Sequence, residues 1–409
     1  MRCIAGRNEY AIAAPAGKEI MKNIASNQKS LTVSILSLSL LTVMAGAAVA
    51  PALGVIKKYF ADSDQLFVQM IISMPALFIV LTNLFFSSLA KEFGAKTLVT
   101  AGLLLYTLGG CAAGLFNTIG LVLAMRALVG IGVGIIMPLS TGLLSYYFPP
   151  EQQEGLMGWS SAMNQMGGVV ATLIAGLLAN ISWRLSFLVY LMGLISIVLC
   201  LAFMPNDRIG TAQPVKEKGS CGAFGRYHTH IVAMFLLMTA FFLYPKNFAI
   251  VTASEGIIPA KYTSVIMAGM DLVAFFGGLL FVSVKKLCGR YTKLAAPVLF
   301  TIGYVLLAFT GGGWAGVLIG SACVGFANGC GVPCIISAAS RAAGRSAATE
   351  VMPLISAALY LAQFASPFLL SLVRNITACG AVRLPYYTAV GVSVILMLWS
   401  GVREPRKKA

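Results

Sequence analysis

Residues 121–138 read LVLAMRALVGIGVGIIMP, an apolar run in which Arg126 is the one charged residue. The run lies within a longer apolar segment, 119–147. A helix needs roughly 20 predominantly apolar residues to cross the hydrocarbon core of a bilayer. The segment is long enough, so it predicts a transmembrane helix with two glycines four residues apart, Gly130 and Gly134, near its middle.

The glycine pattern of this helix recurs 195 residues later in the chain. Each matched pair contains the same residue type, and the pairs are Gly130 and Gly325, Gly134 and Gly329, Pro138 and Pro333, and, at a connection between helices, Gly94 and Gly289. Chance matching is the alternative, because the chain contains 42 glycines. We interpret the pattern as an internal repeat, and parallel repeats of six helices occur in one large class of transporters. In such repeats small residues allow close helix packing.

The composition of the whole chain agrees with a lipid environment. Of its 409 residues, 58% are hydrophobic and 10% are charged, whereas a soluble domain has about 25% charged residues. Too few polar groups remain to cover a water-soluble surface. The net charge of +16 does not predict nucleic-acid binding, because the basic residues lie in short connections and tails between apolar runs. No motif or residue cluster predicts a metal or cofactor site.

The remaining apolar runs predict an all-α membrane protein with twelve transmembrane helices in two six-helix bundles, the first at 31–204 and the second at 231–402. A polar segment, 205–230, is predicted to be a cytoplasmic linker between them, and 1–30 and 403–409 are predicted to be cytoplasmic tails. The twelve runs are 31–55, 64–90, 96–117, 119–147, 154–180, 183–204, 231–253, 260–286, 294–312, 315–339, 347–374 and 384–402.

Basic residues predict the orientation, since Lys and Arg are enriched in cytoplasmic connections. With the N-terminus in the cytoplasm, 21 of the 29 basic residues fall in inside segments and 6 in outside segments. Both termini are therefore predicted to be cytoplasmic. We expect an integral protein of a bacterial inner (plasma) membrane, and a monomer.

The connection between the second and third helices resembles the GxLaDRxGRR gate motif of the major facilitator superfamily. Leu89, Gly94 and Lys96 match this pattern, whereas Lys91 stands at the aspartate position and Glu92 at the arginine position, so the two charges are exchanged. In the family this aspartate helps to lock the cytoplasmic gate. The exchange leaves open whether the motif still gates here.

Further motifs extend the resemblance over about 31–402. Arg126, Gly130, Gly132 and Gly134 resemble the RxxxGxGxG pattern of the fourth helix. The stretches 146–149, YYFP, and 183–187, WRLSF, resemble the exit from that helix and the start of the sixth. Drug–proton antiporters of the family carry a Gly-Pro signature in the fifth helix; here 167–171 reads GGVVA and has no proline.

Three charged residues within the spans are candidates for mechanism, because a charge at membrane depth needs a partner or a wet cavity. The resemblance implies that Arg126 contacts substrate or influences proton movement; the alternative is that it reaches the outer interface. Asp271 is the only carboxylate deep in a predicted span, and burial favours its protonated form, which suits proton coupling. A structural ion pair or hydrogen bond is the alternative, and Lys246 lies at a compatible depth in the neighbouring helix.

Polar amides are the other candidates for the transport pathway: Asn83, Asn164, Gln165, Asn328 and Gln363. They either face a central cavity or form hydrogen bonds between helices, which stabilise packing by about 0.6–2 kcal/mol. The aromatic residues Phe241, Phe242 and Tyr244 either line a hydrophobic pocket or face lipid and core.

We therefore predict a secondary transporter that moves a small organic solute by alternating access, coupled to protons. Efflux of amphipathic compounds and uptake of organic anions are competing functions within this class. A receptor or scaffold that has lost transport is a further alternative, favoured by the exchanged Lys91 and Glu92. A membrane-embedded enzyme is not supported, since the sequence contains no catalytic cluster.

Overall fold

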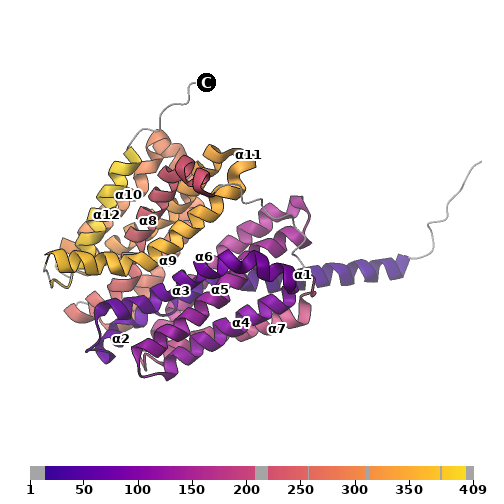
Figure 1. Ribbon diagram of the computed structural model, residues 1–409, viewed down its shortest axis with the longest axis horizontal. Coiled ribbons are helices and arrows are strands. Elements are labelled where there is room, and N and C mark those ends of the chain that lie inside the picture. Colours follow the sequence, from indigo (N-terminus) through magenta and orange to yellow (C-terminus); the bar gives the residue numbers. More distant parts are fainter. Residues whose placement is uncertain (1–13, 208–219, 257, 310–312, 378–379, 402–409) are drawn as a thin grey trace, which may run out of the picture.

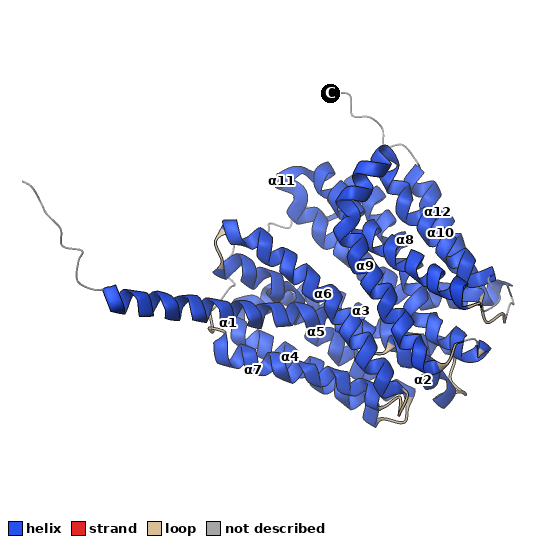
Figure 2. Ribbon diagram, turned by 180° about the vertical axis from the view of Figure 1, so that it is seen from behind, coloured by secondary structure: helices blue, strands red, loops and turns tan. Residues whose placement is uncertain are grey.

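The computed structural model describes residues 14–207, 220–256, 258–309, 313–377 and 380–401. Within these ranges the chain consists of α-helices and short 3-10 helices, with no strand. Twelve helical segments are long and apolar enough to cross a membrane, which confirms the prediction from the apolar runs. Opposite views show long helices gathered into one bundled body, with the beginning of α1 extending beyond it (Figures 1 and 2).

The first six spans are formed by the following elements in chain order: α1 (Ala14–Ala47), η1 (Ala50–Ala52), α2 (Leu53–Tyr59), α3 (Gln65–Glu92), α4 (Ala95–Ala112), η2 (Ala113–Leu115), α5 (Ile119–Tyr147), α6 (Pro150–Ala179), η3 (Leu185–Leu191) and α7 (Met192–Phe203). The first span is interrupted at η1, where Pro51 cannot donate a helix hydrogen bond.

The last six spans are formed by α8 (Ser220–Glu255), α9 (Ala260–Cys288), η4 (Gly289–Tyr291), α10 (Thr292–Phe309), α11 (Trp314–Thr377) and α12 (Leu384–Gly401). The element α11 contains two spans, Trp314–Ala343 and Val351–Thr377. Helix α8 begins within the segment assigned to the linker, but its membrane span begins only at Tyr227, so its first residues extend the helix beyond membrane level.

The twelve spans form two six-helix bundles that lie side by side (Figure 1). In the first bundle α1 packs on α6, and α5 packs on α3 and α4. In the second, α11 packs on α8, α9 and α10, and α10 packs on α12. The bundles meet mainly where α6 packs on α9 and where α3 packs on α11. The site between the bundles is therefore bordered by α3, α6, α9 and α11.

The repeated glycines contact their neighbours at equivalent positions in the two bundles. A Cβ added to Gly130 would overlap the backbone of Pro75 in α3, and one added to Gly325 would overlap the backbone of Met270 in α9. Met270 follows Pro75 by 195 residues, the offset of the sequence repeat. Small residues let helix backbones approach closely, so the repeat identified in the sequence corresponds to a repeated helix contact.

The second glycine pair follows the same rule. Gly134 lies against Ile79 and Thr82 of α3, and Gly329 lies against Ala274 of α9. Ala274 again follows Ile79 by 195 residues. The pair at the helix connections differs, because Gly289 adopts a positive φ of 51°, whereas Gly94 has an extended backbone with φ −70°.

We predict that Gly134→Leu prevents normal packing of α5 on α3. A Cβ at this position would lie 2.6 Å from the Thr82 Cβ, and overpacking costs about 1–3 kcal/mol or more. Gly142→Leu is the matched control, since Gly142 is in the same helix and has open space around its Cβ position. Size-exclusion chromatography of the purified variants should show loss of monodisperse protein for Gly134→Leu only. Equal behaviour of the two variants would contradict the packing role.

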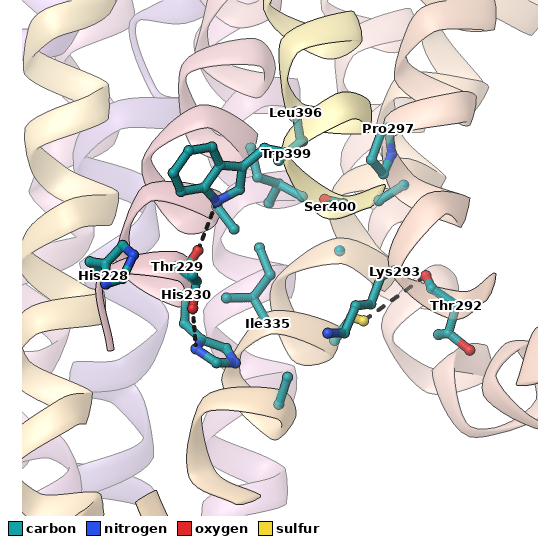
Figure 3. A pocket seen from close by; sticks show the side chains of 16 residues that line it. His228, Thr229, His230, Thr292, Lys293, Pro297, Ile335, Leu396, Trp399 and Ser400 are labelled. Atoms are coloured by element: carbon teal, nitrogen blue, oxygen red, sulfur yellow. Dashed lines mark hydrogen bonds between the residues drawn. The ribbon is translucent and has the colours of Figure 1, made fainter. Parts of the chain in front are cut away.

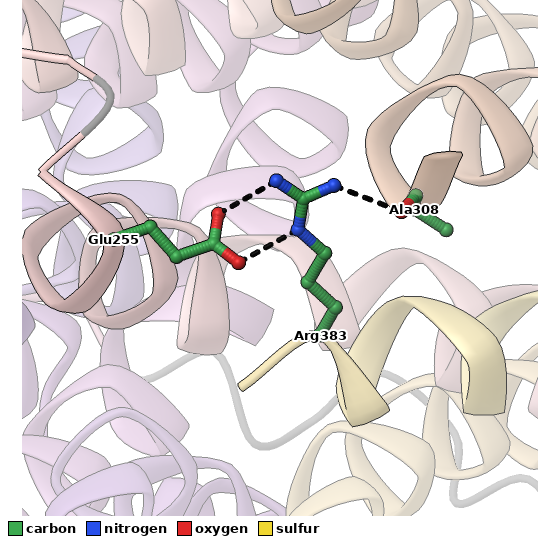
Figure 4. A network of polar contacts seen from close by, with 3 residues as sticks. All are labelled: Glu255, Ala308 and Arg383. Carbon is green, nitrogen blue, oxygen red and sulfur yellow. Dashed lines mark hydrogen bonds and ion pairs between the residues drawn. The ribbon is translucent and has the colours of Figure 1, made fainter. Parts of the chain in front are cut away.

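An ion pair fastens the second bundle at the end opposite the linker. Arg383 donates from Nε to Glu255 Oε1 at 2.7 Å and from Nη2 to Oε2 at 3.0 Å. Its Nη1 donates to the Ala308 carbonyl at 2.9 Å (Figure 4). One side chain therefore joins the ends of α8 and α10 to the start of α12, which keeps these three helices in register.

Candidate functional site

A cavity of about 880 Å³ lies between the two bundles. This volume is within the range of about 300–1,000 Å³ that is usual for small-molecule sites. Its walls are formed by α1, α3 and α6 of the first bundle and by α8, α9 and α11 of the second. A solute bound there would contact both halves of the protein, which is the requirement for an alternating-access site near the middle of the bilayer.

Hydrogen bonds tie the bundles together at the end of the spans opposite the linker. Gln69 of α3 donates to Asn247 of α8 at 2.5 Å. Arg374, near the end of α11, donates to Gln65 Oε1 at the start of α3 at 2.7 Å. The cavity lining instead reaches toward the linker end, as far as Gly158. These contacts therefore hold the two bundles together on the side away from the linker.

Asp271 lies on the wall of this cavity. Thr172 of α6 donates its hydroxyl to Asp271 Oδ2 at 3.2 Å, so this carboxylate is held by a helix of the opposite bundle. Among the described residues that line the cavity, Asp271 is the only one with a formal charge. Its protonation state therefore determines the charge of the whole lining.

Four of the five amides predicted from the sequence also line the cavity: Asn164, Gln165, Asn328 and Gln363. The fifth, Asn83, is exposed and is not part of the lining. Asn164 Oδ1 accepts a hydrogen bond from Thr42 of α1 at 2.5 Å. Gln363 Nε2 donates to the Ile72 carbonyl of α3 at 3.3 Å and so joins the two bundles. The Oδ1 atom of Asn328 is buried and has no hydrogen-bond partner among the described residues, which leaves it available to a donor group of a solute.

Aromatic side chains supply much of the apolar wall. Phe241 and Phe242 of α8 line the cavity, as do Phe275 of α9 and Tyr360 of α11. Tyr244 does not; it is buried within the second bundle, stacks on Phe248 with ring centroids 4.7 Å apart, and donates to Ser321 at 2.7 Å. Phe275 and Tyr360 could not be recognised from the sequence, because many aromatic residues in spans face lipid or core.

Arg126 is fully buried and lies behind the cavity wall. Its Nε donates to the Ile71 carbonyl at 2.7 Å, and its other nitrogens donate to the Ala45 carbonyl and the Tyr190 hydroxyl. Ile71 precedes Pro75 by four residues, and proline has no N–H to donate to that carbonyl. Arg126 therefore caps a free helix carbonyl, and the alternative in which it reaches the outer interface is wrong because its side chain has no exposure.

Lys246 does not pair with Asp271, which corrects the ion pair considered from depth alone. Its Nζ donates to the Gln363 carbonyl and, at 2.5 Å, to the Ser366 hydroxyl. The Gln363 carbonyl would be the helix acceptor for residue 367, which is proline. Lys246 therefore donates to a carbonyl of α11 that lacks its backbone N–H partner, as Arg126 does in α3. Neither buried cation lines the cavity.

The gate motif between α3 and α4 is anchored to the end of the first bundle. Ala95 N donates to the Asp207 carbonyl at 2.8 Å, and Lys96 Nζ donates to the Leu201 carbonyl at 2.7 Å. The exchanged residues Lys91 and Glu92 are exposed. No ion pair joins either of them to another residue in the described part of the chain.

The two remaining motif residues have backbone roles. Leu89 accepts the hydrogen bond that ends α3, from the Phe93 N–H at 3.0 Å. Gly94 leaves space for Asn206, which a Cβ at this position would overlap. The motif therefore positions the connection between α3 and α4.

Comparison with curated proteins shows several transporters that resemble parts of the chain. It is 25% identical over 141 residues to the riboflavin transporter RibZ of Clostridioides difficile (strain 630), covering 34% of this chain and 31% of the relative. It is 28% identical over 165 residues to the hexuronate transporter of Bacillus subtilis (strain 168), covering 39% of each. It is 21% identical over 260 residues to the quinolone resistance protein NorA of Staphylococcus aureus (strain MSSA476), covering 61% of this chain and 66% of NorA. The matched part thus spans less than two thirds of each of these relatives.

Solved structures share the fold over most of the chain. The nucleoside transporter NupG superposes with a TM-score of 0.72 at 14% identity, covering 90% of this chain and 97% of NupG. A bacterial homologue of the human lysosomal transporter Spinster gives a TM-score of 0.70 at 14% identity, covering 91% and 96%. The family model described as Major Facilitator Superfamily matches residues 35–367. With the twelve spans and the central cavity, this match shows that the chain belongs to the major facilitator superfamily of secondary transporters.

Proposed function

We propose that this transporter moves a small amphipathic organic solute, neutral or cationic, and couples its movement to protons through Asp271. The observation that supports this proposal best is the position of Asp271, the one charged group among the described residues of the cavity lining, at a contact between the two bundles. Every conformational exchange of the bundles changes the surroundings of this carboxylate.

The coupling follows from the cost of a charge at membrane depth. When the cavity is open to water, the ionised carboxylate is solvated. When the bundles close around it, the protonated form is favoured because it carries no charge into the dry site. A carrier that exchanges conformation more readily with a protonated Asp271 links proton movement to solute movement.

The wall of the cavity supports the choice of solute. Phe241, Phe242 and Phe275 provide flat apolar surface, and Asn164 and Asn328 provide hydrogen-bonding groups. The described lining contains no lysine, arginine or histidine to bind an organic anion, so we do not favour anion uptake. The negative charge of Asp271 also favours a cationic over an anionic solute.

The function is tested with purified protein in proteoliposomes with an imposed pH gradient of either sign. The solutes named for the three relatives are useful probes: riboflavin and a quinolone are aromatic, whereas a hexuronate is a polar anion. We expect gradient-driven accumulation of an aromatic probe, and the sign of the gradient that drives it gives the direction of transport. Transport of the hexuronate alone would contradict the proposed solute class, and no movement of a wider panel would favour the receptor alternative.

We also propose that both termini face the cytoplasm of a bacterial plasma membrane and that the chain acts as a monomer. On a background without accessible cysteines, Lys58→Cys and Lys285→Cys place thiols at exposed positions at opposite ends of the spans. A membrane-impermeant maleimide should label the first in intact cells and the second only after permeabilisation. The reverse pattern would contradict the orientation.

A further inference from the structure

A second pocket, of about 350 Å³, lies wholly within the second bundle. It is formed by α8, α10, α11 and α12, and it shares no lining residue with the central cavity. Its volume is within the lower part of the range for small-molecule sites. Figure 3 shows that its side chains converge from these separate helices.

The mouth of this pocket lies where the spans end. Lys293 is the second residue of its span, and Trp399 is two residues from the end of its own, Leu384–Gly401. Leu237 of the interior lies ten residues beyond Tyr227, the start of its span, or about 15 Å at 1.5 Å per residue. The pocket therefore extends from the level of the lipid headgroups into the hydrocarbon region, and tryptophan is enriched at that headgroup level.

The mouth is basic. Lys293, His228 and His230 line the pocket, and the described lining contains no aspartate or glutamate. Figure 3 shows Lys293 extending from α10 over the pocket toward Ile335. Each of the three basic residues already takes part in at least one further interaction, so an anion would join an existing network.

The interior, by contrast, is apolar. It is lined by small and aliphatic side chains, namely Ala233, Leu237, Ala296, Pro297, Ile335, Ala338 and Leu396. Trp399 of α12 donates its indole N–H to the Thr229 carbonyl of α8 at 3.1 Å, which fixes the ring at the mouth (Figure 3).

We propose that this pocket binds an anionic amphiphile, with its apolar chain in the interior and its acidic headgroup beside Lys293. An apolar interior excludes a small hydrophilic anion, and a basic mouth at headgroup level favours acidic over zwitterionic lipids. A bilayer phospholipid and a free fatty acid share this chemistry. Because the occupant would join α8, α10, α11 and α12, it would also stabilise the second bundle against rearrangement.

Trp399 provides the readout, since bromine atoms on an acyl chain quench a tryptophan that they contact. The difference in fluorescence between the wild-type protein and Trp399→Phe isolates the signal of this residue. Vesicles of phosphatidylcholine would contain brominated phosphatidylglycerol, brominated phosphatidylcholine or a brominated free fatty acid. We expect stronger quenching by the phosphatidylglycerol, the fatty acid or both than by the zwitterionic lipid, and the arm that quenches identifies the source.

Two variants separate a built site from general lipid contact. Lys293→Gln removes an exposed charge. It should raise the concentration of acidic lipid needed for half-maximal quenching about tenfold, the effect of one lost charge-assisted hydrogen bond. Lys285→Gln is the matched control, because Lys285 is exposed near the same end of the spans but does not line the pocket. The proposal is overturned if acidic and zwitterionic lipids quench wild-type Trp399 equally, or if Lys293→Gln keeps the full preference.

Discussion

Asp271→Asn should abolish pH-driven accumulation of the solute while exchange of solute along its own gradient continues. Asparagine keeps the size of the side chain and an oxygen that accepts the hydrogen bond from Thr172, but it cannot take up or release a proton. The variant therefore removes the proposed coupling step and leaves the cavity wall in place. Transport in proteoliposomes with and without an imposed pH gradient gives both quantities.

Asn328→Ala is the matched control for this experiment. Asn328 also lines the cavity, and its Oδ1 has no partner in the described part of the protein. Its loss should weaken solute binding and raise KM, while the ratio of transport with and without the pH gradient stays that of the wild type. A well-folded Asp271→Asn protein with unchanged pH-driven accumulation would rule out the coupling role.

The sequence was sufficient to predict features that depend on position along a helix. The twelve apolar runs predicted the spans, and the offset of 195 residues predicted that the helices containing Gly130 and Gly325 are equivalent. The structure shows both glycines against equivalent positions, Pro75 and Met270. Such features are predictable because length, hydrophobicity and small size act locally, whatever the neighbouring helix is.

Side-chain direction was the part that sequence could not supply. Lys246 and Asp271 lie at compatible depths, yet one contacts α11 and the other contacts α6 of the opposite bundle. A helix turns once every 3.6 residues. An error of one or two residues in deciding which side of a helix faces its neighbour therefore points the side chain at a different helix. Depth alone therefore permitted an ion pair that the arrangement of the helices excludes.

The sequence contains the prolines that explain the positions of the two buried cations, but it does not show which proline belongs to which cation. Prolines at positions 75 and 367 each leave one helix carbonyl without its N–H donor. Other spans contain prolines as well, so the sequence does not identify which free carbonyl a given Arg or Lys reaches. The structure pairs Arg126 with Ile71 and Lys246 with Gln363, and it is this pairing that gives each cation a structural role.

Lys246→Met should strongly reduce the yield and thermal stability of the folded protein, and the second change that restores them identifies the partner of Lys246. The variant removes the Nζ donor of the Gln363 carbonyl, which keeps only the Ser366 hydroxyl at 3.2 Å, and a hydrogen bond from a charged group contributes about 1.5–3 kcal/mol. Adding Pro367→Ala supplies a backbone N–H that can donate to that carbonyl as in an ordinary helix. The double variant Lys246→Met/Pro367→Ala should therefore be more stable than Lys246→Met alone, by a non-additive amount in a double-mutant cycle.

If an ion pair with Asp271 were the true interaction, Asp271→Asn would restore stability instead, because removing one partner leaves the other charge buried and unpaired. Thermal unfolding of the single and double variants in detergent distinguishes the two. Restoration by Asp271→Asn and not by Pro367→Ala would contradict the role of Lys246 as a cap for α11.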